Sequence, residues 1–418
     1  MLLFQAAGRG NAVSDTLREP LFDEERMRVY PRMILGAYVI GIIAIVLVSK
    51  AMIDPFGKAL GYDFITFWAA SHLTLLGDPA AAFDAAKIFA AEKFAVAGNE
   101  VIYLWHYPPT YQLLTAPLAL MPYMLSFVVF VGTGLIAYVL ALRPLLADFG
   151  RRESTLLVLA FPGLFICAMN GQNSVFTAAL FAAAILAHER GRIWLAGLAL
   201  GLLAFKPQFG ILVPVALIAA GQWRLIFTTG VVTIVFAGIS ALFLGVDLWL
   251  VFIKDAPLVR QIMEQGFLPW EKMPSAFIFF FYFGVSASIA YVFQAVTALA
   301  AAATTAYVWR KVGPSRLSWA VLVSATLLVS PYIFYYEYAV LAVPLFILAS
   351  DMAARGATRN EKIALLVFYV LPFVASNIAE YTHFQIGFPM LLAALYISTK
   401  RALSTDASCV SLPTPVPL

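Results

Sequence analysis

One carboxylate, Asp63, lies among aromatic side chains in the stretch GYDFITFWAA, directly after a long apolar run. Aromatic neighbours limit access of water, and poor solvation raises the pKa of a carboxyl group. Within hydrogen-bond reach of a hydroxyl group, such a carboxylate can take its proton as a general base. The residues alone leave a second interpretation open, in which Asp63 caps a helix or is solvated at a membrane surface.

Several cations could hold a phosphate group near this carboxylate. Lys206 is the only cation in the short loops on one side of the expected membrane topology, and it can neutralise a phosphate as a point charge. It could instead be an interfacial lysine whose stem is buried. His106 could bind phosphate or sugar, or simply pack at the interface. Arg260 and Lys272 are further phosphate candidates, although exposure in a loop also explains them.

Other polar side chains could bind a sugar or an acceptor. Gln172 and Asn173, in the sequence NGQN, could hydrogen-bond sugar hydroxyls or cap a helix. Glu337 could occupy a second catalytic position by orienting the acceptor, or it could pair with Lys206. The remaining sugar- or acceptor-binding candidates carry rings that could contact a sugar, although aromatic belts also explain tyrosines; these candidates are Tyr107, Tyr332, Tyr336 and His383.

No motif points to cofactor chemistry. The four histidines, at 72, 106, 188 and 383, lack the spacing of a zinc site. Neither a P-loop nor a dinucleotide-binding fingerprint is present in its required context. We therefore expect no cofactor and no dedicated metal site, while a divalent metal supplied with the substrate stays open.

Composition places these residues in a membrane protein. The 418-residue chain is 62% hydrophobic and 12% charged, whereas soluble domains carry about 25% charged residues. Its net charge of +4 comes from basic residues scattered over loops, which excludes a nucleic-acid partner. The bilayer itself is the expected partner.

Apolar runs and basic loops predict the topology. Lys and Arg concentrate in short cytoplasmic loops, and here every second loop is basic, which predicts an all-α protein of about twelve transmembrane helices with both termini in the cytosol. A run from Met33 to about Met52 reads as a signal anchor. The predicted parts are a cytoplasmic segment at 1–32, a transmembrane domain at 33–401 with extracytoplasmic loops at 54–122 and 246–273, and a flexible cytoplasmic tail at 402–418.

The opposite, extracytoplasmic face carries the polar motifs. Asp78-Pro79 and Gly98 predict the start and stop of a helix within the first outer loop. From Ser174 to Ala187 a helix rises only about 21 Å, against a hydrocarbon core of about 30 Å. Polar groups survive below the membrane surface only inside protein or against a wet cavity, so we expect an outward-facing polar cavity.

The order of these motifs resembles a known family. The segments that carry the resemblance are Asp63, the YPP at 107–109, the GQN at 171–173, Lys206-Pro207, and the SPY at 330–332 with Tyr336-Glu337. Together, over roughly residues 30 to 400, they resemble glycosyltransferase family 87 (the DUF2029 type), polyprenol-phosphate-mannose-dependent enzymes of the GT-C class related to the mycobacterial phosphatidylinositol-mannoside mannosyltransferases. The family often has His or Asp where this chain has Tyr and Glu, which puts the role of Glu337 in doubt.

The resemblance implies a GT-C fold, a polyprenyl-phosphate sugar donor that often carries mannose, and an aspartate base in the first outer loop, a role that falls on Asp63. We expect a hexosyltransferase of a bacterial inner membrane, acting on a lipid or glycan acceptor at the periplasmic side with inversion at the anomeric carbon. Transport or flipping of lipid-linked sugars, and ligation or polymerisation of glycans, are the alternatives. Clustering of polar motifs on one face, without an evident internal repeat, favours the enzyme over the transporter.

Overall fold

The computed structural model describes residues 24–146 and 148–409, and this part of the chain is helical apart from two isolated β-bridges. Five of its helices are long and apolar enough to cross a membrane, or seven spans if each of two bent helix pairs is one span. Twelve spans are therefore not shown. The long helices are α2 (Glu24–Val48), α6 (Tyr123–Leu142), α12 (Trp223–Leu244), α15 (Ala287–Val312) and α17 (Tyr338–Arg355).

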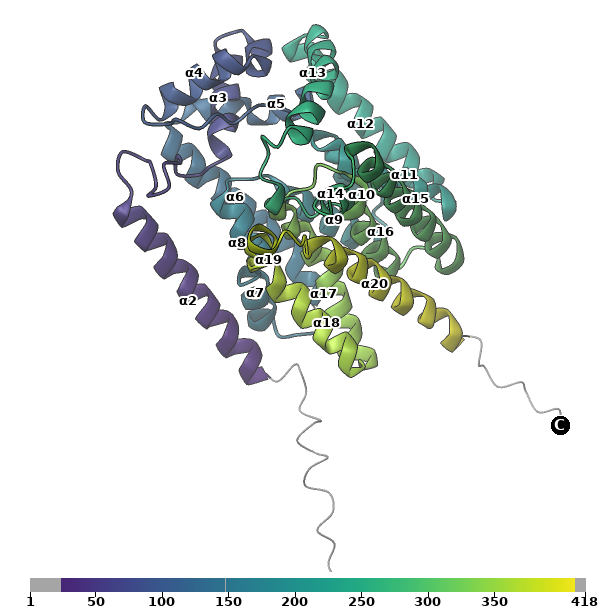
Figure 1. Ribbon diagram of the computed structural model, residues 1–418. Coiled ribbons are helices and arrows are strands. Elements are labelled where there is room, and N and C mark those ends of the chain that lie inside the picture. The colour runs from purple at the N-terminus through teal and green to yellow at the C-terminus, as the bar shows by residue number, and fades with distance from the viewer. Residues whose placement is uncertain (1–23, 147, 410–418) are drawn as a thin grey trace, which may run out of the picture.

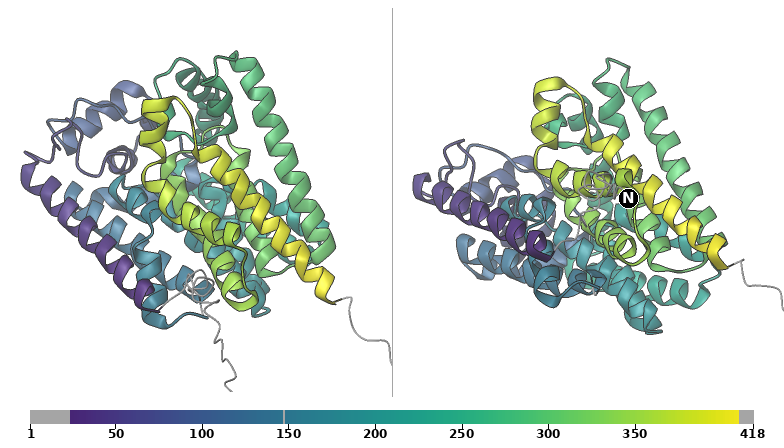
Figure 2. Two further views of the ribbon diagram at one scale, coloured as in Figure 1. Left: turned by 60° about the horizontal axis from the view of Figure 1, so that its bottom comes forward. Right: turned by 90° about the horizontal axis from the view of Figure 1, so that it is seen from below.

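Helix α17 is the central helix of the molecule, since 83% of its apolar window is buried. By contrast, only 6% of the window of α2 is buried, so α2 offers most of its apolar surface to the bilayer. Figures 1 and 2 show α2 along one edge, far from α15 at the opposite edge. Helices α8 (Pro162–Met169), α9 (Ser174–Glu189) and α16 (Arg316–Val329) pack against α17.

Shorter and broken helices fill the space between the long ones. A bend of 50° separates α7 (Arg151–Leu159) from α8, which begins at a proline. A bend of 71° separates α18 (Arg359–Val370) with η8 (Leu371–Phe373) from α19 (Ala375–Thr382). The other elements of this kind are α10 (Ile193–Leu202), η4 (Leu203–Phe205), η5 (Pro207–Phe209), α11 (Leu212–Ala219), η7 (Tyr335–Glu337) and η3 (Arg143–Leu146).

The first long loop is helical, as predicted, but in separate pieces. Asp78 accepts a hydrogen bond from the backbone N–H of Ala81 and begins η1 (Pro79–Phe83). Asp84 then takes an extended conformation and caps α4 (Ala85–Ala95), so one predicted helix becomes two. Around them lie α3 (Phe64–Leu75), α5 (Pro109–Thr115) and η2 (Ala116–Leu120).

The second long loop is also mostly helical. It contains α13 (Asp247–Glu264) and η6 (Trp270–Lys272), and α14 (Ala276–Phe281) follows it. In Figure 1, α3, α4 and α13 lie together at the top of the molecule. Helix α2 begins, and α20 (Gly387–Cys409) ends, at the opposite end. Of the two predicted terminal segments, residues 1–23 and 410–418 lie outside the described residues, while α20 continues past residue 401 to Cys409.

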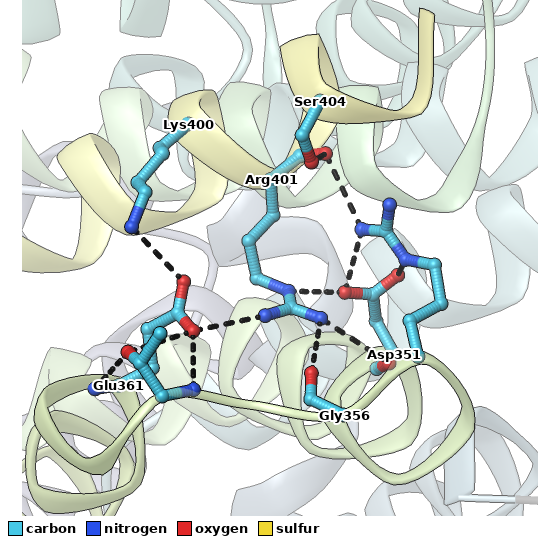
Figure 3. A network of polar contacts seen from close by, with 8 residues as sticks. Asp351, Gly356, Glu361, Lys400, Arg401 and Ser404 are labelled. Atoms are coloured by element: carbon cyan, nitrogen blue, oxygen red, sulfur yellow. Dashed lines mark hydrogen bonds and ion pairs between the residues drawn. The ribbon is translucent and has the colours of Figure 1, made fainter. Parts of the chain in front are cut away.

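An ion-pair network ties helices together at the end opposite α3 (Figure 3). Arg401 of α20 pairs with Asp351 of α17 and, at 3.2 Å, with Glu361 of α18. Lys400 lies 3.4 Å from Glu361, and Arg401 also donates to the carbonyl oxygen of Gly356 at 3.0 Å. The network fixes the end of α20 against the turn between α17 and α18.

Candidate active site

Two glycine-containing turns meet at the start of α3. Gly61 has φ +95° and Gly171, in the turn before α9, has φ +58°. A Cβ on Gly171 would lie 2.4 Å from the Cβ of Phe64 and 2.8 Å from the carbonyl oxygen of Gly61. Only glycine allows both the left-handed conformation and this close approach. The contact brings the segment of Asp63 against the NGQN segment.

Asp63 is held by the side chain of Gln172. The Nε2 of Gln172 donates to Oδ2 of Asp63 at 2.7 Å. The other amide atom, Oε1, accepts from the hydroxyl of Tyr107 at 3.1 Å and from the backbone N–H of Asn173 at 3.3 Å. These two donors fix the orientation of the amide, so its N–H group points to the carboxylate. Asp63 makes no side-chain capping bond to α3, so helix capping does not explain it.

Burial and nearby lysines act on Asp63 in opposite directions. Burial raises the pKa of Asp63, whereas the bond from Gln172 and the positive charges of Lys272, Lys58 and Lys206 lower it. The residue keeps partial solvent exposure. A carboxylate that is poorly hydrated but still reachable has the character required of a general base.

Of the three lysines that lower the pKa of Asp63, Lys272 and Lys58 have the larger effects. Burial lowers the pKa of Lys272, as does the charge of Lys58, while Glu271, Asp63 and Glu380 oppose this shift. The Lys272 ammonium lies 5.3 Å from the ring centroid of Tyr335. Sequence reasoning identified Lys272 but missed Lys58. Lys58 could have been identified from its position, since it lies only a few residues before Asp63 in the same loop.

Lys206 and Glu337 form a buried ion pair next to this cluster. Their Nζ and Oε1 atoms are 2.6 Å apart, and the side chains are 3% and 4% exposed. Lys206 also donates to Oδ1 of Asn173 at 2.7 Å and to Oγ of Ser174 at 3.2 Å. Ser174 in turn donates to Oε2 of Glu337 at 2.7 Å. The sequence left two roles open for Glu337, and pairing with Lys206 was one of them. Because of this pairing, the Lys206 ammonium group points into the protein interior.

Two tyrosines of η7 close the cluster. The hydroxyl of Tyr335 donates to Oδ1 of Asn170 at 2.9 Å. The buried ring of Tyr336 lies with its centroid 5.7 Å from the Lys206 ammonium. Tyr335, Asn170 and Ser174 were not among the residues singled out from the sequence. The Tyr335–Asn170 and Ser174–Glu337 hydrogen bonds each join residues more than 150 positions apart in the chain, and only the fold brings them together.

Two other predicted site residues, His106 and Arg260, form ion pairs with residues of α13. His106 pairs with Asp255 of α13, with 2.8 Å between Nδ1 and Oδ2. Arg260 pairs with Glu264 at 2.6 Å on the exposed side of α13, and its guanidinium lies 4.8 Å from the ring centroid of Tyr291.

His383 and Tyr332 are also outside the central cluster. His383 is exposed at the end of α19 with φ +54°, and the backbone N–H of Tyr332 donates to Ser330 at 3.1 Å. Within residues 24–146 and 148–409, none of Arg260, His383 and Tyr332 makes a hydrogen bond or ion pair with the Asp63–Gln172 or Lys206–Glu337 groups. In the same part of the chain, no group of three or more His, Cys, Asp and Glu side chains is placed to hold a metal ion.

Comparison with known families identifies the class of protein. The family model described as Glycosyltransferase family 87 matches residues 105–331, which is more than half of the chain. The chain belongs to glycosyltransferase family 87. No curated protein and no solved structure matches it.

Family 87 membership makes the chain a glycosyltransferase, and its several long apolar helices indicate an integral membrane protein. The matched region contains Tyr107, Gln172, Asn173 and Lys206. Asp63 and Glu337 lie outside it.

Proposed function

We propose that this family 87 enzyme transfers a hexose from a polyprenyl-phosphate sugar to a hydroxyl group of a lipid or glycan, with Asp63 as the general base. One observation carries the proposal: a partly exposed, poorly hydrated carboxylate is oriented by Gln172 and faced by Lys272 and Lys58. The base and the phosphate-binding cations of such a transfer are thereby close together. Mannose is the sugar favoured by the family resemblance.

The transfer is a single displacement. The acceptor oxygen forms a bond to the anomeric carbon as the bond from that carbon to the phosphate oxygen breaks, and the hydroxyl proton passes to Asp63. The electron pair of the broken bond leaves with the prenyl phosphate. Lys272 and Lys58 stabilise the negative charge on the departing phosphate. Because the nucleophile enters opposite the leaving group, the anomeric centre is inverted.

The Lys206–Glu337 pair positions the site in this proposal. Both charges are satisfied by each other and by Asn173 and Ser174, so the pair fixes the start of α9 and with it the neighbouring Gln172. His106, paired with Asp255, connects the first outer loop to α13, the helix that carries Arg260. Tyr107 acts through Gln172, and Tyr336 covers the ion pair.

The site lies in the extracytoplasmic half of the protein in this proposal. The α3 end of the molecule is opposite the end with the Arg401 network and the turn between α17 and α18 (Figure 1). Basic loops stay in the cytosol, which supports an outward-facing site in a bacterial inner membrane. A donor carried on a lipid suits that compartment, where nucleotide sugars are scarce.

Replacement of the proposed base tests the function. Purified enzyme is supplied with polyprenyl-phosphate mannose and cell lipids, and transfer of labelled sugar is measured. Asp63→Asn should lower kcat/KM by about 10²- to 10⁴-fold, the typical contribution of general-base catalysis, with the melting temperature retained. Asp84→Asn is the matched control, because Asn caps α4 as well as Asp does. Full activity of Asp63→Asn would refute the proposal, and translocation of the donor without bond cleavage would indicate a transporter.

A further inference from the structure

A long apolar groove lies over α9 and between α6 and α10, and its upper part adjoins the site at Tyr111, whose ring centroid is 4.6 Å from that of Tyr107. Its upper and lower parts have cavity volumes of about 540 Å³ and 500 Å³. The two parts share five lining residues, so they form one continuous groove; the shared residues are Ala137, Ala141, Leu180, Ala183 and Leu202. Leu140, Leu195 and Leu198 on its rim are 56%, 49% and 44% exposed, so the groove opens to the surrounding lipid.

Small side chains create this groove. Ala179, Ala183 and Ala187 follow one another at four-residue spacing along the face of α9 that forms the floor. From Phe176 to Arg190 this face extends over about 21 Å, whereas one leaflet contributes about half of the 30 Å hydrocarbon core. The groove is therefore long enough for the acyl chain of a lipid in one leaflet.

The lower end of the groove is positively charged. Arg190 and Arg192, in the turn between α9 and α10, line it and are exposed. The adjacent acid, Glu189, is bound in a bidentate manner by Arg316, at 2.6 and 3.1 Å. Neither Arg190 nor Arg192 has an ion-pair partner within the described ranges. Two unneutralised cations at the mouth of an apolar groove complement an anionic headgroup with its chain attached.

Two exposed tryptophans place this end of the groove at a membrane interface. Trp194 and Trp223 are 65% and 64% exposed. Trp194 follows Arg192 by two residues in the first turn of α10, and Trp223 begins α12 beside Gln222, which contacts His188 at the end of α9. Tryptophan is enriched at the level of lipid headgroups. From the groove, the arginines and this interfacial position, we infer that the α6–α9–α10 groove binds one anionic phospholipid, with its phosphate at Arg190 and Arg192 and an acyl chain along α9.

The same surface suits a phospholipid better than the prenyl chain of a sugar donor. A donor must present its phosphate near Asp63 and Lys272, which leaves the two arginines without an anion. A phospholipid anchored at Arg190 and Arg192 satisfies both the charged end and the apolar length of the groove. The preference for a phospholipid over the sugar donor rests on the proposed function, whereas the charged end and the apolar length of the groove are independent of it.

Lipid binding to delipidated full-length protein in detergent tests the inference. Phosphatidylglycerol and phosphatidylcholine with identical acyl chains are titrated, and bound lipid is measured by native mass spectrometry. The wild type should prefer phosphatidylglycerol. Arg190→Gln with Arg192→Gln should weaken phosphatidylglycerol binding about thirtyfold, since each cation near an anionic headgroup contributes about fivefold. Arg224→Gln, an exposed cation beside Trp223 that does not line the groove, is the charge control.

A second variant tests the apolar part of the groove. Ala183→Phe should fill the groove and reduce binding of either phospholipid, while Ala300→Phe on the exposed side of α15 should not. Melting temperatures without added lipid verify that each variant is folded. Three results would each overturn the inference. They are equal binding of the two phospholipids, undiminished binding to either groove variant, and displacement of phosphatidylglycerol by a prenyl phosphate.

Discussion

At the scale of single residues, the chemistry depends on opposing influences on one carboxylate. Burial makes Asp63 a stronger base, whereas Gln172 and three lysines keep its ionised form accessible. A fully desolvated carboxylate would stay protonated and could not accept a proton, and a fully hydrated one would be a weak base. These opposing influences are what the proposed role of Asp63 as a general base requires.

The pH dependence of catalysis tests this balance through Lys272. The positive charge of Lys272 lowers the pKa of Asp63, so Lys272→Met should raise that pKa. Because the base must be ionised, the acidic limb of the kcat/KM profile should move to higher pH. Loss of a cation at the departing phosphate should also lower the rate, by about 10- to 100-fold. Lys254→Met, which removes an exposed cation from α13, should leave the profile unchanged; an unshifted limb in Lys272→Met would contradict the assignment.

The buried pair of Lys206 and Glu337 distinguishes positioning from phosphate binding. Removal of one partner leaves an uncompensated buried charge, so Lys206→Met or Glu337→Gln should destabilise the protein by about 3–5 kcal/mol. The double variant Lys206→Met with Glu337→Met should recover most of that loss and retain measurable transfer. Thermal unfolding and sugar transfer are measured on the same samples. A stable double variant without any activity would show that Lys206 binds the donor directly.

The sequence indicated which segments would lie close together, but not which side chains would contact each other. The order of motifs predicted that Asp63 and the GQN segment share one face, and they do meet. It could not show that the amide of Gln172 orients the acid, nor that Lys58 faces it. Such contacts depend on two turns approaching each other through Gly61 and Gly171, and no periodic pattern encodes that distance.

At the scale of elements, the long helices were predictable and the broken ones were not. The apolar run predicted to begin at Met33 lies largely within α2, and the short helix predicted from Ser174 is α9. Apolar composition reports the length of a run but not where it bends. Pro162 begins α8 and Pro207 begins η5 inside apolar stretches, and Pro372 is the second residue of η8. For this reason the sequence indicated twelve spans where five to seven are seen in the described chain.

Close packing of α10 against α12 holds one wall of the α6–α9–α10 groove. The sequence GLALG places Gly197 and Gly201 on one face of α10. Added Cβ atoms would lie 2.2 Å from Oγ1 of Thr228 and 2.6 Å from Cβ of Val232. This is the small-residue packing common between membrane helices.

The prediction is that Gly197→Ala and Gly201→Ala each lower the unfolding free energy by about 1–3 kcal/mol through overpacking. Gly230→Ala and Gly238→Ala on α12 meet open space and should have little effect. Thermal or denaturant unfolding in detergent provides the comparison. Equal stability of both pairs would mean that α10 and α12 are free to separate.

At the scale of the whole molecule, the two ends differ in chemistry. One end carries Asp63 with Lys272 and Lys58. The other end carries the network in which Arg401 of α20 pairs with acids of α17 and α18. A lipid-linked donor could reach the first end sideways from the bilayer. The anionic phospholipid proposed at Arg190 and Arg192 would be anchored at the second end.

Accessibility of cysteines in intact cells tests this polarity. The native Cys167 and Cys409 are first replaced by alanine. Ala86→Cys in α4 and Asn360→Cys in α18 are both exposed, at opposite ends of the molecule. Because basic loops remain in the cytosol, a membrane-impermeant maleimide should label Ala86→Cys in intact cells and Asn360→Cys only after lysis. The reverse pattern would place Asp63 in the cytosol, where nucleotide sugars are available, and would remove the reason to expect a lipid-linked donor.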